Sequence, residues 1–480
     1  MKSMLFNTAT SYAASIKNKS ITSLDLVKAH IAYIKKHNGR INAVIHLDEE
    51  NALAQARLAD ERIANGMDMG PLHGVPMTIK DAFRIKGVPT TYGLPQYKNY
   101  LPKEDCEMVR RLKNSGAIVI GKTNLPFASF DWQCRHPNGK EGKNPWNQAH
   151  TPGGSSGGSA ASVAAGFSPI ELGSDIAGSI RYPAHCCGVL GLRTTDGLLP
   201  SEDWGPEDLE TAFHRIVTCG PLARNVDDLI LLLQVLDTNA TPPIKDIKKT
   251  LRIAYTSSIL GVDNDQATQK HFETFIGALK EDGHQCKEKP PEGIDFEECY
   301  RIWGHIVGYE YRDVLPRFFK TAFGRILFDG YFLNLRLGNG RLTRYFKAGL
   351  NSSEDEYQKV LLEHQDVAKR MKRFMSEFDL WILPTSPSPA ILRSRYGSFF
   401  KHNGQHKDYS SFLGNYLTPT ALLGTPALNV PIGFAEGLPI GVQVHGAPFS
   451  DHRLLQITKE HLEKYIAVKW PDDFGPPLPT

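Results

Sequence analysis

Two loops of small residues carry the hydroxyl groups best suited to nucleophilic chemistry. Thr151–Ser159 holds four glycines and three serines in nine positions and leads into the alanine-rich stretch Ala160–Ala165, while Ser174–Ser179 ends on a serine behind small residues. Glycines let the backbone pass close to a reacting group, and successive N–H groups beside a nucleophile can hold an oxyanion. Both loops therefore indicate a serine nucleophile, although a Gly/Ser run alone is also typical of a flexible linker.

A serine nucleophile needs a base, and Lys80 is the candidate. Neither loop combines a Gly-x-Ser-x-Gly spelling with an obvious order of His and Asp partners. Lysine can serve when its amine is neutral, and burial disfavours the charged form. Lys80 ends Val75–Lys80, a short β-prone run that we expect to be a strand. A solvated lysine at a strand end is the competing interpretation.

The segments around these residues alternate between strand and helix. Strands are expected at Val75–Lys80, Ala117–Ile120 and Pro169–Gly173, with helices at Glu107–Leu112 and Ala160–Ala165 between them. Such alternation predicts an α/β fold.

Further elements are expected on both sides of this core. Ser23 and Asn225 are the expected N-caps of two helices, the second being Val226–Leu236. From about residue 241 to 379 charged and then aromatic residues become frequent, which favours a more helical lobe. Short apolar strands return at Leu380–Leu383, Ala427–Val430 and Ile440–Val444.

The composition is that of a globular protein with balanced charge. The 480 residues are 41% hydrophobic, and 55 basic against 52 acidic side chains leave a formal net charge of +3. This balance argues against a nucleic acid or an anionic membrane as a partner. Seven thinly spread cysteines argue against a disulfide scaffold and for a reducing, cytoplasmic location. There is no run of about 18 apolar residues, so no membrane span is expected.

Two motifs invite other functions. Gly116–Thr123 has the spelling of a phosphate-binding loop, but the four residues between its glycines are Ala, Ile, Val and Ile, which favour a strand. His185, Cys186 and Cys187 are adjacent and cannot readily ligate one zinc ion, and no Cys-x-x-Cys pair accompanies them. We therefore expect no nucleotide, metal or other cofactor.

Several segments match the sequence motifs of one known family. They are Pro71–Asp81, Gly121–Asn124, Asn144–Asn147, Thr151–Ser159, Leu172–Arg181, Cys187–Arg193, Leu383–Thr385, Gly424–Ala427 and Gly437–Gln443. The set closely resembles the amidase signature family, and only about residues 241–379 carry no family signal. The resemblance implies a three-layer α/β/α fold with a large mixed central sheet. We expect residues 1–480 to form a single domain, with residues 241–379 as a helical, aromatic-rich lobe on the substrate side.

The resemblance also implies a Ser–cis-Ser–Lys triad. Ser179 would be the nucleophile and Lys80 the base. Ser155 would be the bridging serine, because the family keeps the two serines 24 residues apart, as 179 − 155 = 24 does here. A cis peptide bond would precede it, between Gly154 and Ser155.

The loop that ends at Ser179 would supply the oxyanion hole. Its donors would be the N–H groups of Ile176, Ala177, Gly178 and Ser179. Asp175 and Arg181 flank the loop, and we expect an ion pair or hydrogen bonds to the loop backbone rather than catalysis. Ser156 is expected to hydrogen-bond locally. Ala177 stands where many members have glycine, which is tolerable while its φ stays negative.

We expect hydrolysis of an amide bond through a Ser179 acyl-enzyme. Aromatic residues crowd the middle region: Trp303, Tyr309, Tyr311, Phe318, Phe319, Phe323, Phe328, Tyr331 and Phe332. Most should lie in the core, and some should line an acyl or aryl pocket, which favours a hydrophobic or aryl amide. The alternatives are the glutaminase subunit of a tRNA-dependent amidotransferase, which needs a partner chain, and an acyltransferase that passes the acyl group to an amine.

The partners expected from this interpretation are few. They are a small-molecule amide substrate and, as one option, a second copy of the chain in a homodimer. Neither a nucleic acid nor a membrane is expected.

Overall fold

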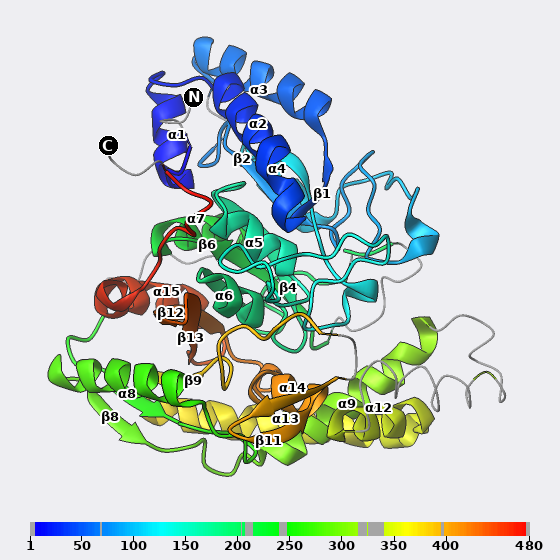
Figure 1. The fold of residues 1–480 in the computed structure, drawn as a ribbon, viewed down its shortest axis with the longest axis vertical. Coiled ribbons are helices and arrows are strands. Elements are labelled where there is room, and N and C mark those ends of the chain that lie inside the picture. Colours follow the sequence, from blue (N-terminus) through cyan, green and yellow to red (C-terminus); the bar gives the residue numbers. More distant parts are fainter. Residues whose placement is uncertain are drawn as a thin grey trace.

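One mixed sheet of eleven strands forms the centre of the molecule (Figure 1). The computed structural model describes residues 5–67, 70–202, 204–206, 215–239, 247–314, 324, 340–394 and 398–476. The strands of the sheet are β1 (Val44–Leu47), β2 (Pro76–Lys80), β3 (Ile118–Thr123), β4 (Ile170–Asp175), β5 (Leu190–Arg193), β6 (Thr218–Ala223), β7 (Arg252–Tyr255), β8 (Gln285–Glu288), β9 (Leu380–Pro384), β12 (Ala427–Ala435) and β13 (Leu438–His445). Their order is β1-β3-β2-β4-β6-β5-β12-β13-β9-β7-β8. A separate hairpin consists of β10 (Phe399–His402) and β11 (Gln405–Asp408).

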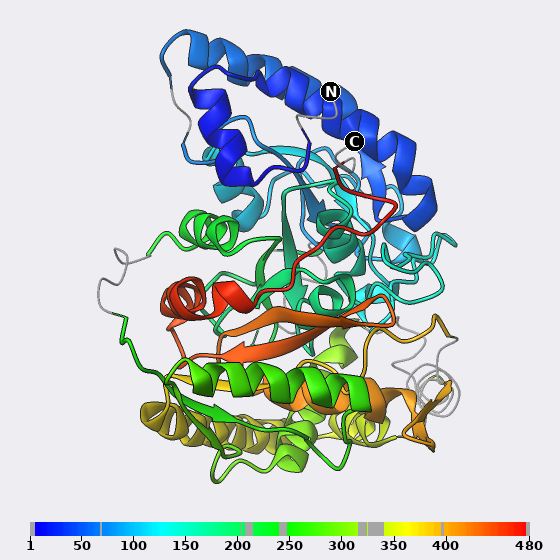
Figure 2. The same ribbon diagram turned by 60° about the vertical axis from the view of Figure 1, so that its left-hand side comes forward.

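Helices lie on both faces of this sheet (Figures 1 and 2). They are α1 (Ala9–Lys17), α2 (Ser23–Ile41), α3 (Glu49–Ala64), α4 (Glu107–Asn114), α5 (Gly157–Ala164), α6 (Arg181–Cys187), α7 (Val226–Leu236), α8 (Gln266–Glu281), α9 (Phe296–Val314), α12 (Arg341–Asn351), α13 (Glu354–Glu377), α14 (Tyr409–Ala421) and α15 (Asp451–Ile457). None of the described helices is both long and apolar enough to cross a bilayer.

Two hydrophobic cores sandwich the sheet. Successive side chains of a strand point to opposite faces, so a strand covered on both sides feeds both cores. In β9, Trp381 and Leu383 join a core shared with α5, α6, α9 and α14, while Leu380 and Ile382 join one shared with α4, α7, α8 and α15. The prediction of a three-layer α/β/α fold is confirmed.

The predicted helix caps are right in one case and displaced in the other. Asn225 caps α7, because its side chain accepts a hydrogen bond from the Asp228 N–H. At α2 the cap is Thr22, which accepts from the Asp25 N–H. The hydroxyl of Ser23 instead donates to the carbonyl of Gly74, 2.8 Å away. A tertiary contact therefore takes the hydroxyl that the sequence pattern assigns to the cap.

The segment with phosphate-loop spelling is a strand, as its residues predict. Ile118–Thr123 is buried throughout and forms β3. Lys122, which the phosphate-loop interpretation would aim at a ligand, is fully buried. Its Nζ donates to the Phe83 carbonyl and to Thr90 Oγ1.

The middle region contains strands as well as helices. Residues 247–314 and 340–379 include α8, α9, α12 and α13, but also β7 and β8 at the edge of the sheet. The strand β8 is mostly exposed and polar, so its sequence lacks the apolar alternation that reveals a buried strand. That this region forms a substrate-side lobe, and that the chain is one domain, stay predictions.

Candidate active site

The parallel pairing of β2 with β4 brings the two predicted loops to one lysine. Thr78 lies opposite Glu171 and Ile79 opposite Leu172, so the carboxyl ends of both strands meet at the same edge of the sheet. Lys80 is the last residue of β2, and the loop that ends at Ser179 leaves β4 at this edge. The strand pairing therefore brings together the predicted base and the loop of the predicted nucleophile, which are far apart in the sequence.

Lys80 is buried and bonded to two hydroxyl groups. Its Nζ lies 2.7 Å from Ser155 Oγ and 2.9 Å from Ser174 Oγ. Burial lowers the pKa of Lys80 to about 7, against the opposing charges of Asp175 and Glu171. The solvated-lysine interpretation is therefore wrong, and a large fraction of the amine is neutral near pH 7.

Ser155 lies between the lysine and the loop Ser174–Ser179, which we call the nucleophile loop because Ser179 is the predicted nucleophile. The peptide bond before it, from Gly154, is cis. Its Oγ also accepts a hydrogen bond from Ser129 Oγ at 2.9 Å. The two loops are joined through the Ser156 N–H, which donates to the Ser179 carbonyl at 3.1 Å.

In the described chain no hydrogen bond joins the hydroxyl groups of Ser155 and Ser179. Catalytic hydrogen bonds are often long in a free enzyme and tighten in the substrate complex. We refer below to Lys80, Ser155, Ser174 and Ser179 as the catalytic cluster.

Ser156 supports the loop that ends at Ser179. Its hydroxyl lies 3.2 Å from the carbonyl oxygen of Ser174 and 3.4 Å from the N–H of the same residue. The structure thus gives Ser156 the local hydrogen bonding that the sequence analysis expects.

Asp175 anchors the nucleophile loop through an ion pair. Both Asp175 and Arg181 are fully buried, and the guanidinium reaches the carboxylate at 3.0 and 3.1 Å. Burial by itself raises the pKa of Asp175, but Arg181 and Arg193 outweigh it and hold this pKa at about 2. The carboxylate also accepts the Gly178 N–H at 2.6 Å.

These bonds divide the four predicted oxyanion donors into one N–H group that is already bonded within the loop and three that are not. Since the Gly178 N–H is given to Asp175, it is already used within the loop. Among the described residues nothing accepts the N–H groups of Ile176, Ala177 or Ser179. These three donors are the ones this geometry leaves for a substrate oxygen.

The backbone explains why only one glycine is required here. Gly178 has a φ of 95°, where a side chain is strained, and an added Cβ would come within 2.7 Å of Leu417. Ala177 is not among the residues with positive φ. Its methyl group, unusual for the family, is therefore accommodated.

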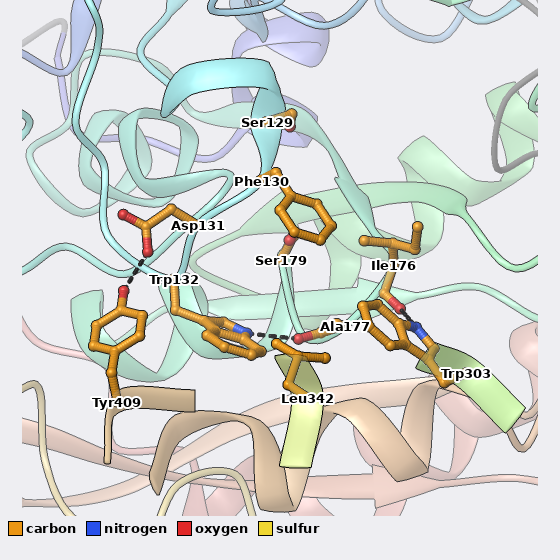
Figure 3. Close-up of a pocket in the computed structure, with 10 residues that line it drawn as sticks. All are labelled: Ser129, Phe130, Asp131, Trp132, Ile176, Ala177, Ser179, Trp303, Leu342 and Tyr409. Atoms are coloured by element: carbon orange, nitrogen blue, oxygen red, sulfur yellow. Dashed lines mark hydrogen bonds between the residues drawn. The ribbon is translucent and has the colours of Figure 1, made fainter. Parts of the chain in front are cut away.

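An apolar pocket opens at Ser179, the predicted nucleophile (Figure 3). Its lining residues are Ser129, Phe130, Asp131, Trp132, Ile176, Ala177, Ser179, Trp303, Leu342 and Tyr409. We call Phe130, Trp132, Trp303, Leu342 and Tyr409 the pocket wall. These five side chains come from the loop before the Gly/Ser segment and from α9, α12 and α14.

Sequence reasoning missed Ser129, Ser174, Trp132 and the wall residues of α12 and α14. Ser174 lies inside a recognised segment, and a hydroxyl at the end of a strand parallel to that of Lys80 is a signal that could have found it. Ser129 and Trp132 carry no such signal, because they reach the site through an irregular loop.

The described aromatic residues of the middle region have different surroundings. Trp303 lines the pocket. Tyr309 stacks on Tyr357 with ring centres 4.0 Å apart, while Tyr311 packs near Phe130. The other expected residues, namely Phe318, Phe319, Phe323, Phe328, Tyr331 and Phe332, lie outside the described residues.

His185 and the two cysteines beside it are engaged in the core. The Nδ1 atom of His185 accepts the Gly441 N–H, and its Nε2 lies 3.1 Å from the Ser388 carbonyl. Cys186 and Cys187 are free thiols and fully buried. In the described part of the chain no cluster of three or more His, Cys, Asp or Glu side chains could hold a metal ion.

Comparison with known proteins points to one family. The family model described as Amidase matches residues 25–455. The chain is 31% identical over 482 residues to a glutamyl-tRNA(Gln) amidotransferase subunit of Carboxydothermus hydrogenoformans, covering 95% of this chain and 96% of that protein. A crystal structure of an amidase superposes with a TM-score of 0.78 at 27% identity, over 94% of this chain and 98% of that one. The structure of 6-aminohexanoate cyclic dimer hydrolase gives 0.77 at 25% identity, over 97% and 98%.

These relatives overturn the expectation that no nucleic acid is involved. Several curated relatives are subunits of an amidotransferase that is named for glutamyl-tRNA(Gln), which is a nucleic acid. The expectation rested on the net charge of +3. A balanced net charge says nothing of how charges are distributed over the surface of the chain, nor of what an assembly containing such a subunit handles.

Proposed function

Because the chain belongs to the amidase signature family, whose enzymes act on carbon–nitrogen bonds, we propose that it cleaves amides through an acyl-enzyme on Ser179. The observation that carries this proposal is the buried Lys80 amine, 2.7 Å from Ser155 Oγ, with its pKa lowered to about 7. A neutral amine at this place can start a proton relay that a charged one cannot.

The reaction then proceeds in two halves. Lys80 takes the proton of Ser155, which takes that of Ser179 as Ser179 Oγ bonds to the amide carbon. The carbonyl oxygen becomes an oxyanion beside the N–H groups of the loop. The proton returns through Ser155 to the amide nitrogen, the carbon–nitrogen bond breaks, and the amine leaves. Water then hydrolyses the Ser179 ester by the same relay.

Two observations favour different acyl groups. The curated relatives favour the glutaminase subunit of a tRNA-dependent amidotransferase, in which glutamine would be the acyl donor and a partner chain would be needed. The pocket wall favours a hydrophobic or aryl amide instead, since Phe130, Trp303 and Leu342 present apolar surface beside Ser179. The comparisons carry more weight for the glutaminase, and the pocket lining keeps the apolar amide as the second candidate.

Ammonia and amine release separates these candidates. The purified chain is assayed with glutamine, with an anilide and with an aliphatic amide, each with and without hydroxylamine as an acyl acceptor. Turnover of glutamine, and co-purification with tRNA and a second protein chain, would support the hypothesis that the chain is the glutaminase subunit of an amidotransferase. Turnover of the anilide by the chain alone would support the apolar amidase, and hydroxamate formation would add acyl transfer.

Covalent labelling tests the shared chemistry. A fluorophosphonate is expected to modify Ser179, as located by peptide mass spectrometry, and Ser179→Ala should remain unmodified. Modification of another serine, or turnover by Ser179→Ala at the normal rate, would refute the proposed nucleophile. A cytoplasmic location belongs to the same proposal and is supported by the seven free thiols.

A further inference from the structure

Two tryptophans hold the oxyanion loop from opposite sides (Figure 3). The indole Nε1 of Trp132 donates to the Ala177 carbonyl at 2.8 Å, and the indole Nε1 of Trp303 donates to the Ile176 carbonyl at 2.8 Å. Both rings are nearly inaccessible to solvent, with 6% and 1% of their surface exposed. In the described part of the chain no other donor bonds these two carbonyls.

Each of these bonds fixes an N–H group as well as a carbonyl. A trans peptide is planar, so its C=O and N–H point in opposite directions. The peptide whose carbonyl faces Trp303 carries the N–H of Ala177, and the peptide whose carbonyl faces Trp132 carries the N–H of Gly178. Trp303 therefore orients a donor that the site leaves open, and Trp132 orients the donor that binds Asp175.

A rotation of the Ile176–Ala177 peptide would reverse the polarity of the site, because it would bring a carbonyl oxygen, which is an acceptor, to the place where the Ala177 N–H stands. A rotation of the Ala177–Gly178 peptide would turn a carbonyl oxygen toward the Asp175 carboxylate and break the bond that anchors the loop. An acceptor facing a developing oxyanion destabilises the transition state, whereas an oriented donor stabilises it. Within the loop the Asp175 carboxylate holds N–H groups only, so the carbonyls of Ile176 and Ala177 depend on the two indoles for their hydrogen bonds.

We propose that Trp132 and Trp303 are positioning residues that orient the oxyanion loop through their indole N–H groups, so that α9 of the middle region helps to build the catalytic site. This inference rests on the proposed function. It assigns a catalytic consequence to a helix from residues 241–379, where the sequence analysis finds no family motif although the Amidase model spans them.

The test removes the indole N–H groups and keeps an aromatic ring. Trp132→Phe and Trp303→Phe are each expected to lower kcat/KM by about 10- to 100-fold, somewhat less than the loss of an oxyanion donor itself. Trp146→Phe is the matched control, because the Trp146 indole also donates to a backbone carbonyl, that of Cys187, at 2.8 Å. Trp146 does not line the pocket, and its variant should keep normal kinetics.

A second readout separates orientation from simple packing. Ser179 Oγ is expected to add to the ketone carbon of trifluoroacetophenone, which turns the ketone oxygen into an oxyanion. The corresponding trifluoromethyl carbinol has no carbonyl group and binds without reacting. We expect both tryptophan variants to weaken binding of the ketone by the same factor as kcat/KM and to leave binding of the carbinol within about two-fold. The fluorophosphonate labelling rate should fall in parallel.

The outcomes are distinct. Equal losses for ketone and carbinol, or normal kcat/KM in both variants, would overturn the positioning role while leaving the nucleophile intact. A wild-type chain that neither turns over an amide nor reacts with the fluorophosphonate would refute the proposed function and this inference together. If one variant fails to fold, the other decides the question, since the two bonds hold successive peptides.

Discussion

The catalytic cluster and the pocket wall are built in opposite ways. The cluster is polar and buried, and the Lys80 amine is bonded to the hydroxyl groups of Ser155 and Ser174 at 2.7 and 2.9 Å. The wall is mostly apolar and is supplied by a loop and three helices that are far apart in the chain. Proton transfer demands fixed distances, whereas an apolar wall demands only shape. Changes in the cluster should therefore alter the rate for every substrate. Changes in the wall should alter the choice among substrates at the residues that do not bond the oxyanion loop, namely Phe130, Leu342 and Tyr409.

The largest expected effect is the loss of the nucleophile. Ser179→Ala should lower kcat by about 10⁴-fold or more for every amide, because no covalent intermediate can form. Its melting temperature should stay close to that of the wild type, since only one oxygen atom is removed. Steady-state kinetics and calorimetry on the same preparation measure both. If Ser179→Ala lost activity for only one class of substrate, the contrast between the catalytic cluster and the pocket wall would not hold.

The next effect concerns the base and has a pH signature. Lys80 must be neutral to act, and its pKa is lowered to about 7, so kcat/KM should rise about tenfold per pH unit below 7 and level off above it. Lys80→Ala should lower kcat by about 10²- to 10⁴-fold and abolish this dependence. A pH–rate profile between pH 5 and 9 checks the prediction.

Lys122 offers a matched control for that experiment. It is also a fully buried lysine whose pKa is lowered by burial, but its Nζ is bonded to Phe83 and Thr90 rather than to the catalytic cluster. Lys122→Met should keep the midpoint of the pH–rate profile, even where it costs stability. A shift of the midpoint in this variant would mean that the pH–rate profile reports the titration of Lys122 rather than that of Lys80.

The third prediction tests the anchor of the nucleophile loop by stability. Asp175→Asn leaves the buried guanidinium groups of Arg181 and Arg193 without their carboxylate, which should cost about 3–5 kcal/mol in the free energy of unfolding. Glu49→Gln removes the exposed partner of Lys35 and should cost less than about 1 kcal/mol. Urea denaturation measures both, and equal costs would contradict the role of Asp175.

The pH dependence of stability should carry the same signature. The folded-state pKa of Asp175 lies at about 2, below its ordinary value of 3.8. The stabilisation from this group is therefore fully present above about pH 4 and is lost as the pH falls toward 2. Asp175→Asn should flatten this part of the stability profile.

The cluster was more predictable from the sequence than the wall, for a physical reason. Lys80, Ser155 and Ser179 lie in contiguous stretches of small or β-prone residues, because strands and tight loops impose strong local constraints on residue type. Asp175 and Arg181 could be paired because they flank one short loop. For these residues, local pattern and family resemblance led to the same positions.

The wall could not be predicted in this way. Leu342 and Tyr409 are ordinary helix residues whose contact with the pocket depends on how α12 and α14 pack against α9. Ser129, which donates to Ser155, has a backbone φ of 54°, which is unusual for a residue other than glycine. The strand β8 was not predicted for a related reason, since it lies at the edge of the sheet and an edge strand can be polar.

A smaller effect is expected at Ser174, the second partner of the lysine. Its hydroxyl accepts from Lys80 and favours the charged amine, so Ser174→Ala should move the midpoint of the pH–rate profile to lower pH. The rate at high pH should fall about tenfold, because the amine is held less firmly. Ser174→Thr should restore both values by returning the hydroxyl.

Ser162→Ala is the control for this substitution. Ser162 lies in α5 and pairs with Thr78 Oγ1 at 2.9 Å, without touching the lysine. Its variant should leave the pH midpoint unchanged. An identical shift in Ser162→Ala would mean that the profile reports general loosening of the site rather than the bond between Ser174 and Lys80.

The smallest effect should appear in the wall and only as a change of preference. Phe130 lines the pocket, and Phe130→Leu removes aromatic surface there, so the ratio of kcat/KM between an anilide and a short aliphatic amide should fall about tenfold. The fluorophosphonate labelling rate and the pH midpoint should not change, because neither depends on the acyl pocket. Phe399→Leu, at a side chain that is 70% exposed in β10, is the control. If Phe130→Leu slowed both substrates equally, Phe130 would share in the chemistry as the two tryptophans do, and the division between rate and choice would not hold for the rest of the wall.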